Sequence, residues 1–271
     1  MTVLAQGAGR EVCHEPRILI VGLGLIGGSL AAALRASGFS GEIIACDPNK
    51  DEIALGIELG LVNAGGTQLA ELLDDVSMVV LAVPVLAMES VMTALAQALP
   101  NAADDVVITD VGSTKATIRE CAERVFGYVL PNIVLGHPIA GSEKSGVAAA
   151  NPTLYVNHKV ILTPEPNVDA DALARVEKLW QACGAEVLQM SVERHDQVLA
   201  RTSHLPHLLA FSLVDTLARQ DERLDIFRYA AGGFRDFTRI AGSDPVMWRD
   251  IFIANREAVL SSLDDFEAGL K

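Results

Sequence analysis

The chain has 271 residues, half of them hydrophobic, and a formal net charge of −14. This length can bury the core of one large domain or two ordinary ones, and the hydrophobic content excludes a chain that is disordered throughout. The negative charge argues against nucleic acid and anionic membranes as partners, because both carry charge of the same sign.

Patterns that direct a chain to a membrane or to export are missing from the sequence. The longest apolar stretch, Val76–Met88, contains Pro84 and is too short to span a bilayer. Residues 1–15 lack the basic and apolar segments of a secretory signal, and the four cysteines show no paired spacing. We therefore expect a cytoplasmic protein with reduced, mostly buried thiols.

A glycine-rich turn connects a predicted buried strand, Arg17–Val21, to a predicted helix, Ile26–Ala36. Its glycines permit a tight turn, let a pyrophosphate approach the backbone, and let helix and strand pack closely. The pyrophosphate would lie at the helix N-terminus, where free N–H groups and the helix dipole favour an anion. The predicted cofactor-binding residues of this turn are Gly22, Gly24, Leu25, Ile26 and Gly27.

A carboxylate follows the second predicted strand, Glu42–Cys46. Asp47 stands 20 residues beyond Gly27, where it can accept both ribose hydroxyls of NAD and would repel the 2′-phosphate of NADP. The alternative is a tight turn whose aspartate only caps a helix. The turn and the carboxylate together predict NAD as the cofactor.

Strands and helices alternate up to about Met190. This alternation predicts a doubly wound, mostly parallel sheet of the Rossmann type over residues 1–190, with a tail at residues 1–15. The further predicted strands are Met78–Ala82, Val106–Asp110, Ile133–Leu135, Lys159–Leu162 and Glu186–Gln189, and the further helices are Leu86–Ala98, Thr114–Phe126 and Ala170–Cys183.

Residues 191–271 are predicted to form a separate, all-α domain. Val192–Arg219 is one long helical pattern broken only by Pro206, and Pro245–Leu263 is another. A domain of about eighty residues has little interior of its own, so an apolar helix face in it is either core or a subunit interface. We expect a homodimer joined through Val192–Leu263. The apolar face consists of Trp248, Ile251, Phe252, Val259, Leu260 and Leu263.

Three loops after predicted strands carry candidate functional residues, because ligands of such sheets bind at the carboxyl ends of the strands. Val83 and Pro84 would lie against the nicotinamide ribose. Ser113 either caps a helix or faces the cofactor. His137 precedes a loop rich in proline and glycine; it is either solvated or placed for proton transfer.

The helical half of this acidic chain supplies positively charged and imidazole groups that could bind an anionic ligand. His204 and His207 are three residues apart and share a helix face, but no third ligand stands at a suitable spacing, so we expect no metal. Arg235 and Arg239 could clamp carboxylates, or they could lie on a surface helix and be neutralised by Asp236. Two histidines and two arginines that could bind carboxylates, in an acidic protein, favour a small dianionic substrate.

Three segments resemble the prephenate/arogenate (cyclohexadienyl) dehydrogenase family. They are Gly136–Glu143, Ser203–His207, and Gly232–Arg239 with the Asp-Pro and Trp-Arg-Asp motifs that follow it, and the resemblance covers Pro16–Phe266. It implies a Rossmann domain followed by an α-helical dimerisation domain. It also implies NAD-dependent oxidative decarboxylation of prephenate to 4-hydroxyphenylpyruvate, or of arogenate to tyrosine, in tyrosine biosynthesis.

The same resemblance implies a role for each matching residue. His137 would accept the proton of the ring hydroxyl, and Ser113 would hydrogen-bond both His137 and that hydroxyl. Arg239 would bind the ring carboxylate, and His207 would lie near the substrate side chain. Arg235 stands where some members have lysine, so the preference between 2-oxo and 2-amino substrates stays open. The other residues expected around the substrate are His204, Glu143 and Asp196.

Two other functions are weighed against this one. A β-hydroxyacid dehydrogenase has the same domain order but requires a lysine in the helical half, and residues 190–270 contain none. A catalytically silent NAD-binding regulator would not need His137, Ser113 and Arg239, which are all present. Both alternatives are therefore disfavoured.

Overall fold

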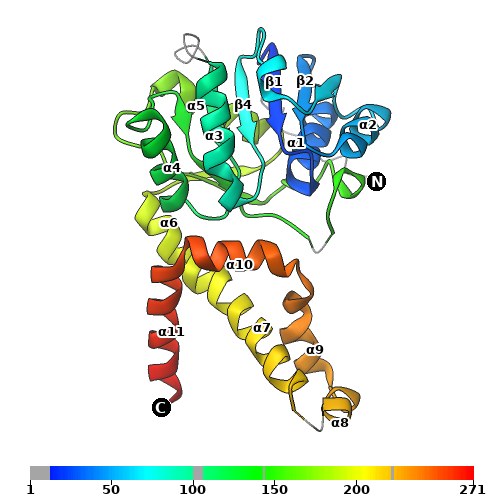
Figure 1. Ribbon diagram of the computed structural model, residues 1–271, viewed down its shortest axis with the longest axis vertical. Coiled ribbons are helices and arrows are strands. Elements are labelled where there is room, and N and C mark those ends of the chain that lie inside the picture. The colour runs from blue at the N-terminus through cyan, green and yellow to red at the C-terminus, as the bar shows by residue number, and fades with distance from the viewer. Residues whose placement is uncertain (1–12, 100–105, 143, 221–222) are drawn as a thin grey trace, which may run out of the picture.

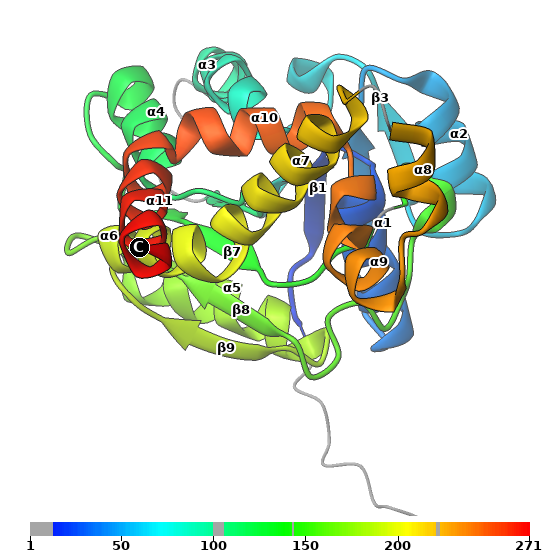
Figure 2. The same cartoon turned by 90° about the horizontal axis from the view of Figure 1, so that it is seen from below.

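The computed structural model describes residues 13–99, 106–142, 144–220 and 223–271. Most of the predicted tail lies outside these ranges. The chain forms a layered α/β half, which ends at β9 (Glu186–Gln189), and then a helical half, which projects from one end of it (Figures 1 and 2). No helix among the described residues is long and apolar enough to cross a membrane.

The α/β half is built on a six-stranded sheet in which all neighbours are parallel. The strand order β3-β2-β1-β4-β5-β6 reverses direction between β1 and β4, and ligands of such sheets bind at that reversal. The strands are β1 (Arg17–Val21), β2 (Glu42–Cys46), β3 (Ala64–Gly66), β4 (Met78–Leu81), β5 (Val107–Asp110) and β6 (Ile133–Val134).

Helices cover both faces of this sheet, as expected for parallel strands that are buried on both sides. Alternate residues of β1 serve the two faces: Ile18 and Ile20 belong to one apolar core, and Leu19 and Val21 belong to another. The first core includes residues of α1 and α5, and the second includes residues of α3 and α4. The helices are α1 (Leu25–Ala36), α2 (Lys50–Glu58), α3 (Met88–Ala98), α4 (Ala116–Phe126) and α5 (Ala170–Ala182).

A second, smaller sheet was not predicted from the sequence. It contains β7 (Gly136–Pro138), β8 (Lys159–Leu162) and β9 (Glu186–Gln189), with β7 antiparallel to β8. The expectation of one sheet was wrong because β7 has three residues, too few for a period of two to be visible. The elements that were predicted up to Gln189 have ends within two residues of those observed.

The first long helix of the helical half departs from a regular α-helix directly before Pro206, the residue at which an interruption was predicted. The helical path runs through α6 (Val192–Leu199), a π turn η4 (Ala200–His204) and α7 (Leu205–Ala218). Pro206 lies in the first turn of α7. Proline has no N–H for the regular ladder, and the π turn directly before it takes up the irregularity.

The second long helix is two helices, which corrects the predicted single helix Pro245–Leu263. α10 (Pro245–Ala254) and α11 (Arg256–Leu270) meet at Asn255, whose backbone is not helical (φ −110°, ψ 32°). The two helices run in different directions (Figure 1). The six apolar residues therefore lie on two helices and do not belong to one helix face. Two short helices, α8 (Arg223–Arg228) and α9 (Gly232–Thr238), and a 3₁₀ turn η5 (Arg239–Gly242) precede α10.

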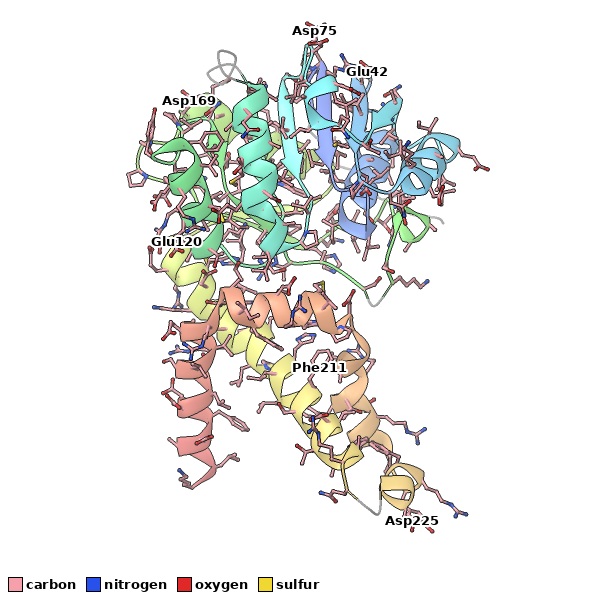
Figure 3. The ribbon with its side chains drawn as sticks, viewed as in Figure 1. Glu42, Asp75, Glu120, Asp169, Phe211 and Asp225 are labelled. Carbon is pink, nitrogen blue, oxygen red and sulfur yellow. The ribbon has the colours of Figure 1, made fainter. Side chains whose placement is uncertain are left out.

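The carboxyl ends of the parallel strands point toward the helical half (Figure 1). Three acidic residues, Glu42, Asp75 and Asp169, lie at the opposite end of the α/β half, far from the helical half (Figure 3). The side chains at the strand carboxyl ends are thus brought to the boundary between the two halves. This boundary is where a site can draw residues from both.

Candidate active site

The turn after β1 has the shape of a phosphate cradle. Gly22 has φ +98°, and a Cβ on it would lie 2.3 Å from the carbonyl oxygen of Ala82. A Cβ on Gly27 would lie 2.1 Å from the Gly22 oxygen, whereas nothing lies within 4 Å of the corresponding place on Gly24. No described side chain caps the first turn of α1. The open side of the turn can therefore present backbone N–H groups to an anion.

Asp47 is held beside this turn by backbone hydrogen bonds. The N–H of Leu23 donates to Asp47 Oδ2 and the N–H of Asn49 donates to Oδ1, both at 2.8 Å. A carboxylate has about four acceptor positions, so the group can still receive two ribose hydroxyls. Within the described residues no cation forms an ion pair with Asp47. The cradle and the carboxylate fit NAD, which the comparisons below also support.

Val83 and Pro84 follow β4 on the other side of the strand-order reversal. A Cβ placed on Gly22 would lie 3.2 Å from Val83 Cγ1, so this loop and the glycine turn are in close contact. Pro84 is exposed and precedes a short 3₁₀ turn, η2 (Val85–Ala87). The loop therefore forms part of the rim at which the sheet meets the cofactor cradle.

His137 lies on β7 and is almost completely buried. Its Nδ1 is 2.8 Å from Nε2 of His195, the fourth residue of α6. Burial lowers the pKa of His137 well below its ordinary value, and the charges of His195, Lys115 and His204 lower it further. His137 is therefore a neutral imidazole at neutral pH, the form that can accept a proton.

The partner of His137 is itself held by a carboxylate. His195 Nδ1 is 2.7 Å from Asp196 Oδ1, and the backbone N–H groups of Lys115 and Ala116 donate to the Asp196 carboxylate at 2.8 and 2.9 Å. Burial raises the pKa of Asp196, but the hydrogen bonds from His195 and the two amides outweigh burial and lower it. Asp196 thus caps α4, so the alternative role of Ser113 as that cap is wrong.

A buried ion pair fixes the backbone beside His137. The Lys115 ammonium bonds to Asp110 Oδ2 and to the carbonyl oxygen of Gly136. Asp110 Oδ1 accepts the Gly136 N–H at 3.1 Å, and Oδ2 accepts the Gly112 N–H at 2.7 Å. Both peptide groups of Gly136 are therefore held by side chains from the end of β5 and the start of α4. Asp110, a charged residue at the end of a buried strand, is the feature of the sequence that could have predicted this buried ion pair.

Two histidines from the helical half lie near Trp248. The ring of His207 stacks on Trp248 with 3.6 Å between centroids, and His207 Nδ1 donates to the Ser203 carbonyl oxygen. His204 is buried, with Nδ1 3.1 Å from Nδ2 of Asn255. Burial lowers the pKa of His204 to about 4, so this ring is neutral at neutral pH. Asn255 also donates to the carbonyl oxygen of Asp196, which explains the break between α10 and α11.

The two candidate arginines are exposed. Arg235 belongs to α9 and Arg239 begins η5. Neither forms an ion pair with any side chain that the structure describes. The charge of Arg239 reaches His207, whose pKa is lowered first by burial and also by this arginine. Arg239 therefore offers an unneutralised guanidinium beside His207, and it is free to receive a carboxylate.

The structure does not bring all predicted site residues together. His137 and Asp196 are joined through His195, and His207 lies in the field of Arg239. Ser113 follows β5, but within the described residues it forms no hydrogen bond with His137, whose ring partner is His195. Glu143 lies outside the described residues. The residues that sequence reasoning missed are His195, Lys115, Asp110 and Asn255.

Comparison with known proteins gives one consistent result. The model for "Prephenate dehydrogenase, nucleotide-binding domain" matches residues 30–189, and the model for "Prephenate dehydrogenase, dimerization domain" matches residues 191–271. A cyclohexadienyl dehydrogenase of Zymomonas mobilis is 40% identical over 261 residues, which cover 94% of this chain and 86% of that protein. A prephenate dehydrogenase of Bacillus subtilis is 38% identical over 254 residues, which cover 92% of this chain and 67% of that protein.

Solved structures agree with these relatives. The Aquifex aeolicus prephenate dehydrogenase in complex with hydroxyphenyl propionate and NAD⁺ has a TM-score of 0.86 at 41% identity, covering 94% of this chain and 87% of that one. The Synechocystis arogenate dehydrogenase has a TM-score of 0.76 at 29% identity, covering 94% and 89%. The similarity thus extends over both halves of the molecule.

Proposed function

Because this chain belongs to the prephenate dehydrogenase family, we propose that it catalyses the NAD-dependent oxidative decarboxylation of prephenate, arogenate or both, in tyrosine biosynthesis. The observation that carries this proposal is His137, a buried neutral imidazole at the boundary where the strand carboxyl ends meet the helical half. A base in that place can act on a ligand that lies between the cofactor cradle and Arg239.

The α/β half would hold the cofactor. The turn residues Gly22, Gly24, Leu25, Ile26 and Gly27 would bind the pyrophosphate, Asp47 would accept the ribose hydroxyls, and Val83 and Pro84 would lie near the nicotinamide ribose. When bound, NAD⁺ supplies the acceptor for the hydride that leaves the ring carbon bearing the hydroxyl.

The same half would move the proton. His137 takes the proton of the ring hydroxyl as the hydride leaves, and Ser113 hydrogen-bonds that hydroxyl. The ring carboxylate departs as CO₂, and the electron pair left behind passes through the ring, which becomes aromatic, to the ring oxygen. That oxygen takes the proton back from His137 and becomes the phenol hydroxyl. Since aromatisation drives the reaction, orientation and one proton transfer are the main tasks of the protein.

The helical half would recognise the substrate. Arg239 binds the ring carboxylate through a forked, charge-assisted pair of hydrogen bonds, which its exposed and unpaired guanidinium can form. His207 and Arg235 face the substrate side chain, while His204, Glu143 and Asp196 shape the polar surroundings. Arg235 stands where some family members have lysine, so the preference between a 2-oxo and a 2-amino substrate stays open and is determined by the rates described below.

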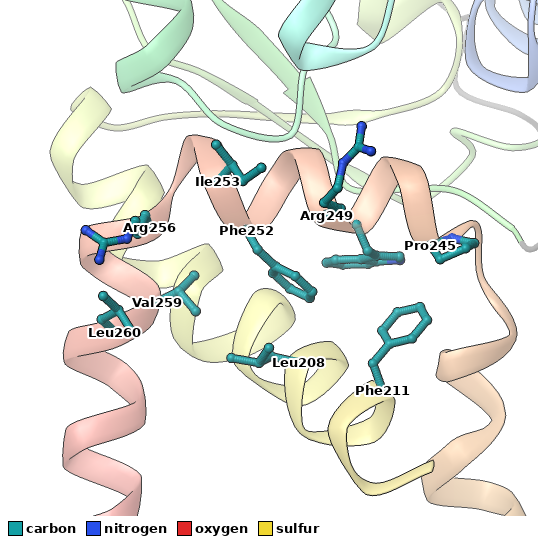
Figure 4. A pocket seen from close by; sticks show the side chains of 10 residues that line it. Leu208, Phe211, Pro245, Arg249, Phe252, Ile253, Arg256, Val259 and Leu260 are labelled. Carbon is teal, nitrogen blue, oxygen red and sulfur yellow. The ribbon is translucent and has the colours of Figure 1, made fainter. Parts of the chain in front are cut away.

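We further propose that two copies pair through Val192–Leu263. α7, α10 and α11 leave an apolar groove between them (Figure 4), and the neighbouring Val246, Met247 and Ile253 are exposed. The name of the C-terminal family model supports this assembly. A monomer at micromolar concentration by sedimentation, fully active, would contradict it. The groove is lined by Leu208, Phe211, Pro245, Trp248, Arg249, Phe252, Ile253, Arg256, Val259 and Leu260.

The proposed function is tested by initial rates of NADH formation with prephenate and with arogenate, each offered with NAD⁺ and with NADP⁺. We expect turnover of at least one substrate, with NAD⁺ preferred. If the purified protein binds NAD⁺ but forms no NADH from either substrate, the alternative of a silent NAD-binding regulator is correct. Turnover of a β-hydroxyacid instead would point to the other dehydrogenase class.

A further inference from the structure

A chain of hydrogen bonds runs from His137 through His195 to Asp196 and ends at the N-terminus of α4. The two ring-to-partner distances are 2.8 Å and 2.7 Å, and the three residues are 8%, 0% and 5% exposed. His137 belongs to the α/β half, whereas His195 and Asp196 belong to the first helix of the helical half. The chain therefore crosses the boundary between the two halves.

The position of each proton in this chain follows from the acceptor at its end. Asp196 receives two backbone N–H groups at a helix N-terminus, which favours the ionised carboxylate. An ionised carboxylate only accepts, so the proton of neutral His195 is on Nδ1 and its Nε2 is an acceptor. His137 must then carry its proton on Nδ1 and donate to His195. The lone pair of neutral His137 is left on Nε2.

We propose that His195 and Asp196 are positioning residues that fix the tautomer of His137 and so make Nε2 the atom that accepts the substrate proton. This inference rests on the proposed function of His137 as the base. Without the carboxylate, His195 can take either tautomer. The tautomer with a proton on Nε2 would donate to Nδ1 of His137, so that His137 would carry its own proton on Nε2. The base would then present an N–H to the hydroxyl.

The same chain stabilises the product of proton transfer. When Nε2 takes the hydroxyl proton, His137 becomes a buried imidazolium, which would be costly without a counter-charge. Its Nδ1–H remains bonded to His195, and His195 remains bonded to ionised Asp196, so the positive charge has a carboxylate two hydrogen bonds away. The other charged groups of this cluster, Lys115 and Asp110, form an ion pair with each other.

The direct test measures the tautomer itself. Long-range ¹H–¹⁵N spectra of ring-labelled protein, with His137 assigned by its loss in His137→Asn, report which ring nitrogen is protonated without any substrate. We expect Nδ1–H in the wild type and a mixture, or Nε2–H, in Asp196→Asn. A wild-type His137 protonated on Nε2 would overturn the proposal. This readout is independent of turnover, so it still decides the matter if the proposed function fails.

Kinetics provide the second readout. Asp196→Asn should lower kcat by roughly 10²–10⁴-fold, the range for a base held in the wrong tautomer, while KM and NAD⁺ affinity change by less than about threefold. The matched control is Glu193→Gln, which removes the exposed ion pair of Glu193 with Arg119 between the same two helices, α6 and α4. The control should keep wild-type kcat.

Two results would show that the contact is only structural. One is an equal loss of kcat in Asp196→Asn and Glu193→Gln, and the other is near-normal kcat in Asp196→Asn with a lowered melting temperature. If Asp196→Asn does not fold, His195→Phe replaces it, because phenylalanine keeps a flat ring in the buried space and removes both hydrogen bonds. His195→Phe with an unchanged tautomer of His137 and unchanged kcat would refute the proposal.

Discussion

The two halves of this molecule differ in how they bury their apolar residues. In the α/β half, β1 and β4 lie between layers of helices, and alternate residues of β1 enter two separate cores. In the helical half, α7, α10 and α11 leave an apolar groove open, and Ile253 and Leu260 are exposed. The first half encloses its apolar cores between the sheet and its helices, whereas the second leaves an apolar groove at its surface. The candidate site lies at the boundary between the two halves.

Each half should therefore control a different step. The α/β half holds the proposed base and the proposed cofactor residues, so changes there should alter the chemical step or the choice of cofactor. The helical half carries Arg239 and the histidines around Trp248, so changes there should alter substrate binding and the stability of the boundary. The predictions below separate these effects.

The largest effect is expected at His137. Asparagine keeps a hydrogen-bonding group but cannot take a proton, so His137→Asn should lower kcat by roughly 10²–10⁴-fold with a smaller change in KM. Because the pKa of His137 is lowered by burial, the wild-type kcat should fall only at acid pH, below the ordinary histidine value. Steady-state rates over a pH series measure both. Near-normal kcat in His137→Asn would show that His137 is not the general base.

Arg239→Gln should change binding in the helical half and leave the cofactor alone. Loss of a charge-assisted bond of about 1.5–3 kcal/mol should raise KM for the substrate roughly ten- to a hundred-fold. Lysine at this position should rescue only part of the loss, since a point charge cannot reproduce the planar fork. Titration of NAD⁺ in the absence of substrate is the control. Weakened NAD⁺ binding with an unchanged substrate KM would show that Arg239 contacts NAD⁺ and not the substrate.

Asp47→Ser should change cofactor choice without touching the helical half. Removing the carboxylate removes its repulsion of a 2′-phosphate, so the ratio of kcat/KM for NAD⁺ over NADP⁺ should fall by about tenfold or more. Substrate KM should stay near the wild-type value. An unchanged ratio would show that Asp47 only supports the turn through its bond from Leu23.

The smallest effect concerns stability at the boundary. The folded-state pKa of His204 is about 4, below its ordinary value of 6.5, so between these pH values the unfolded chain binds a proton that the folded chain does not. Stability is therefore present above about pH 6.5 and is lost as pH falls, at up to about 1.4 kcal/mol per pH unit from this group. The lowered pKa values of His137 and His195 act in the same direction.

Chemical unfolding at about pH 7, 6 and 5 measures this loss. His204→Gln should flatten the dependence on pH, because one of the contributing groups is gone. The matched comparison is a change at the exposed His158, which lies in the α/β half, far along the chain from the boundary. If His204→Gln and His158→Gln have the same slope as the wild type, His204 is not buried in solution as it is here.

The sequence by itself determined the elements whose signal is local. The glycine turn, seven of the nine strands that the structure describes and the place of Asp47 follow from backbone conformation, from runs of apolar residues and from the order of elements along the chain. The motifs around His137 and Arg239 were sufficient to identify the family, which the comparisons establish. Such features need no knowledge of which distant residues meet.

Only the tertiary structure decided the contacts between distant residues. His137 and His195 are 58 residues apart in the chain, and Asp196 caps a helix that begins 80 residues before it. The helix break at Asn255 has the same origin, because its side chain bonds to Asp196 and His204. A hydrogen bond between remote residues leaves no period or spacing in the sequence, since it depends on how the two halves pack.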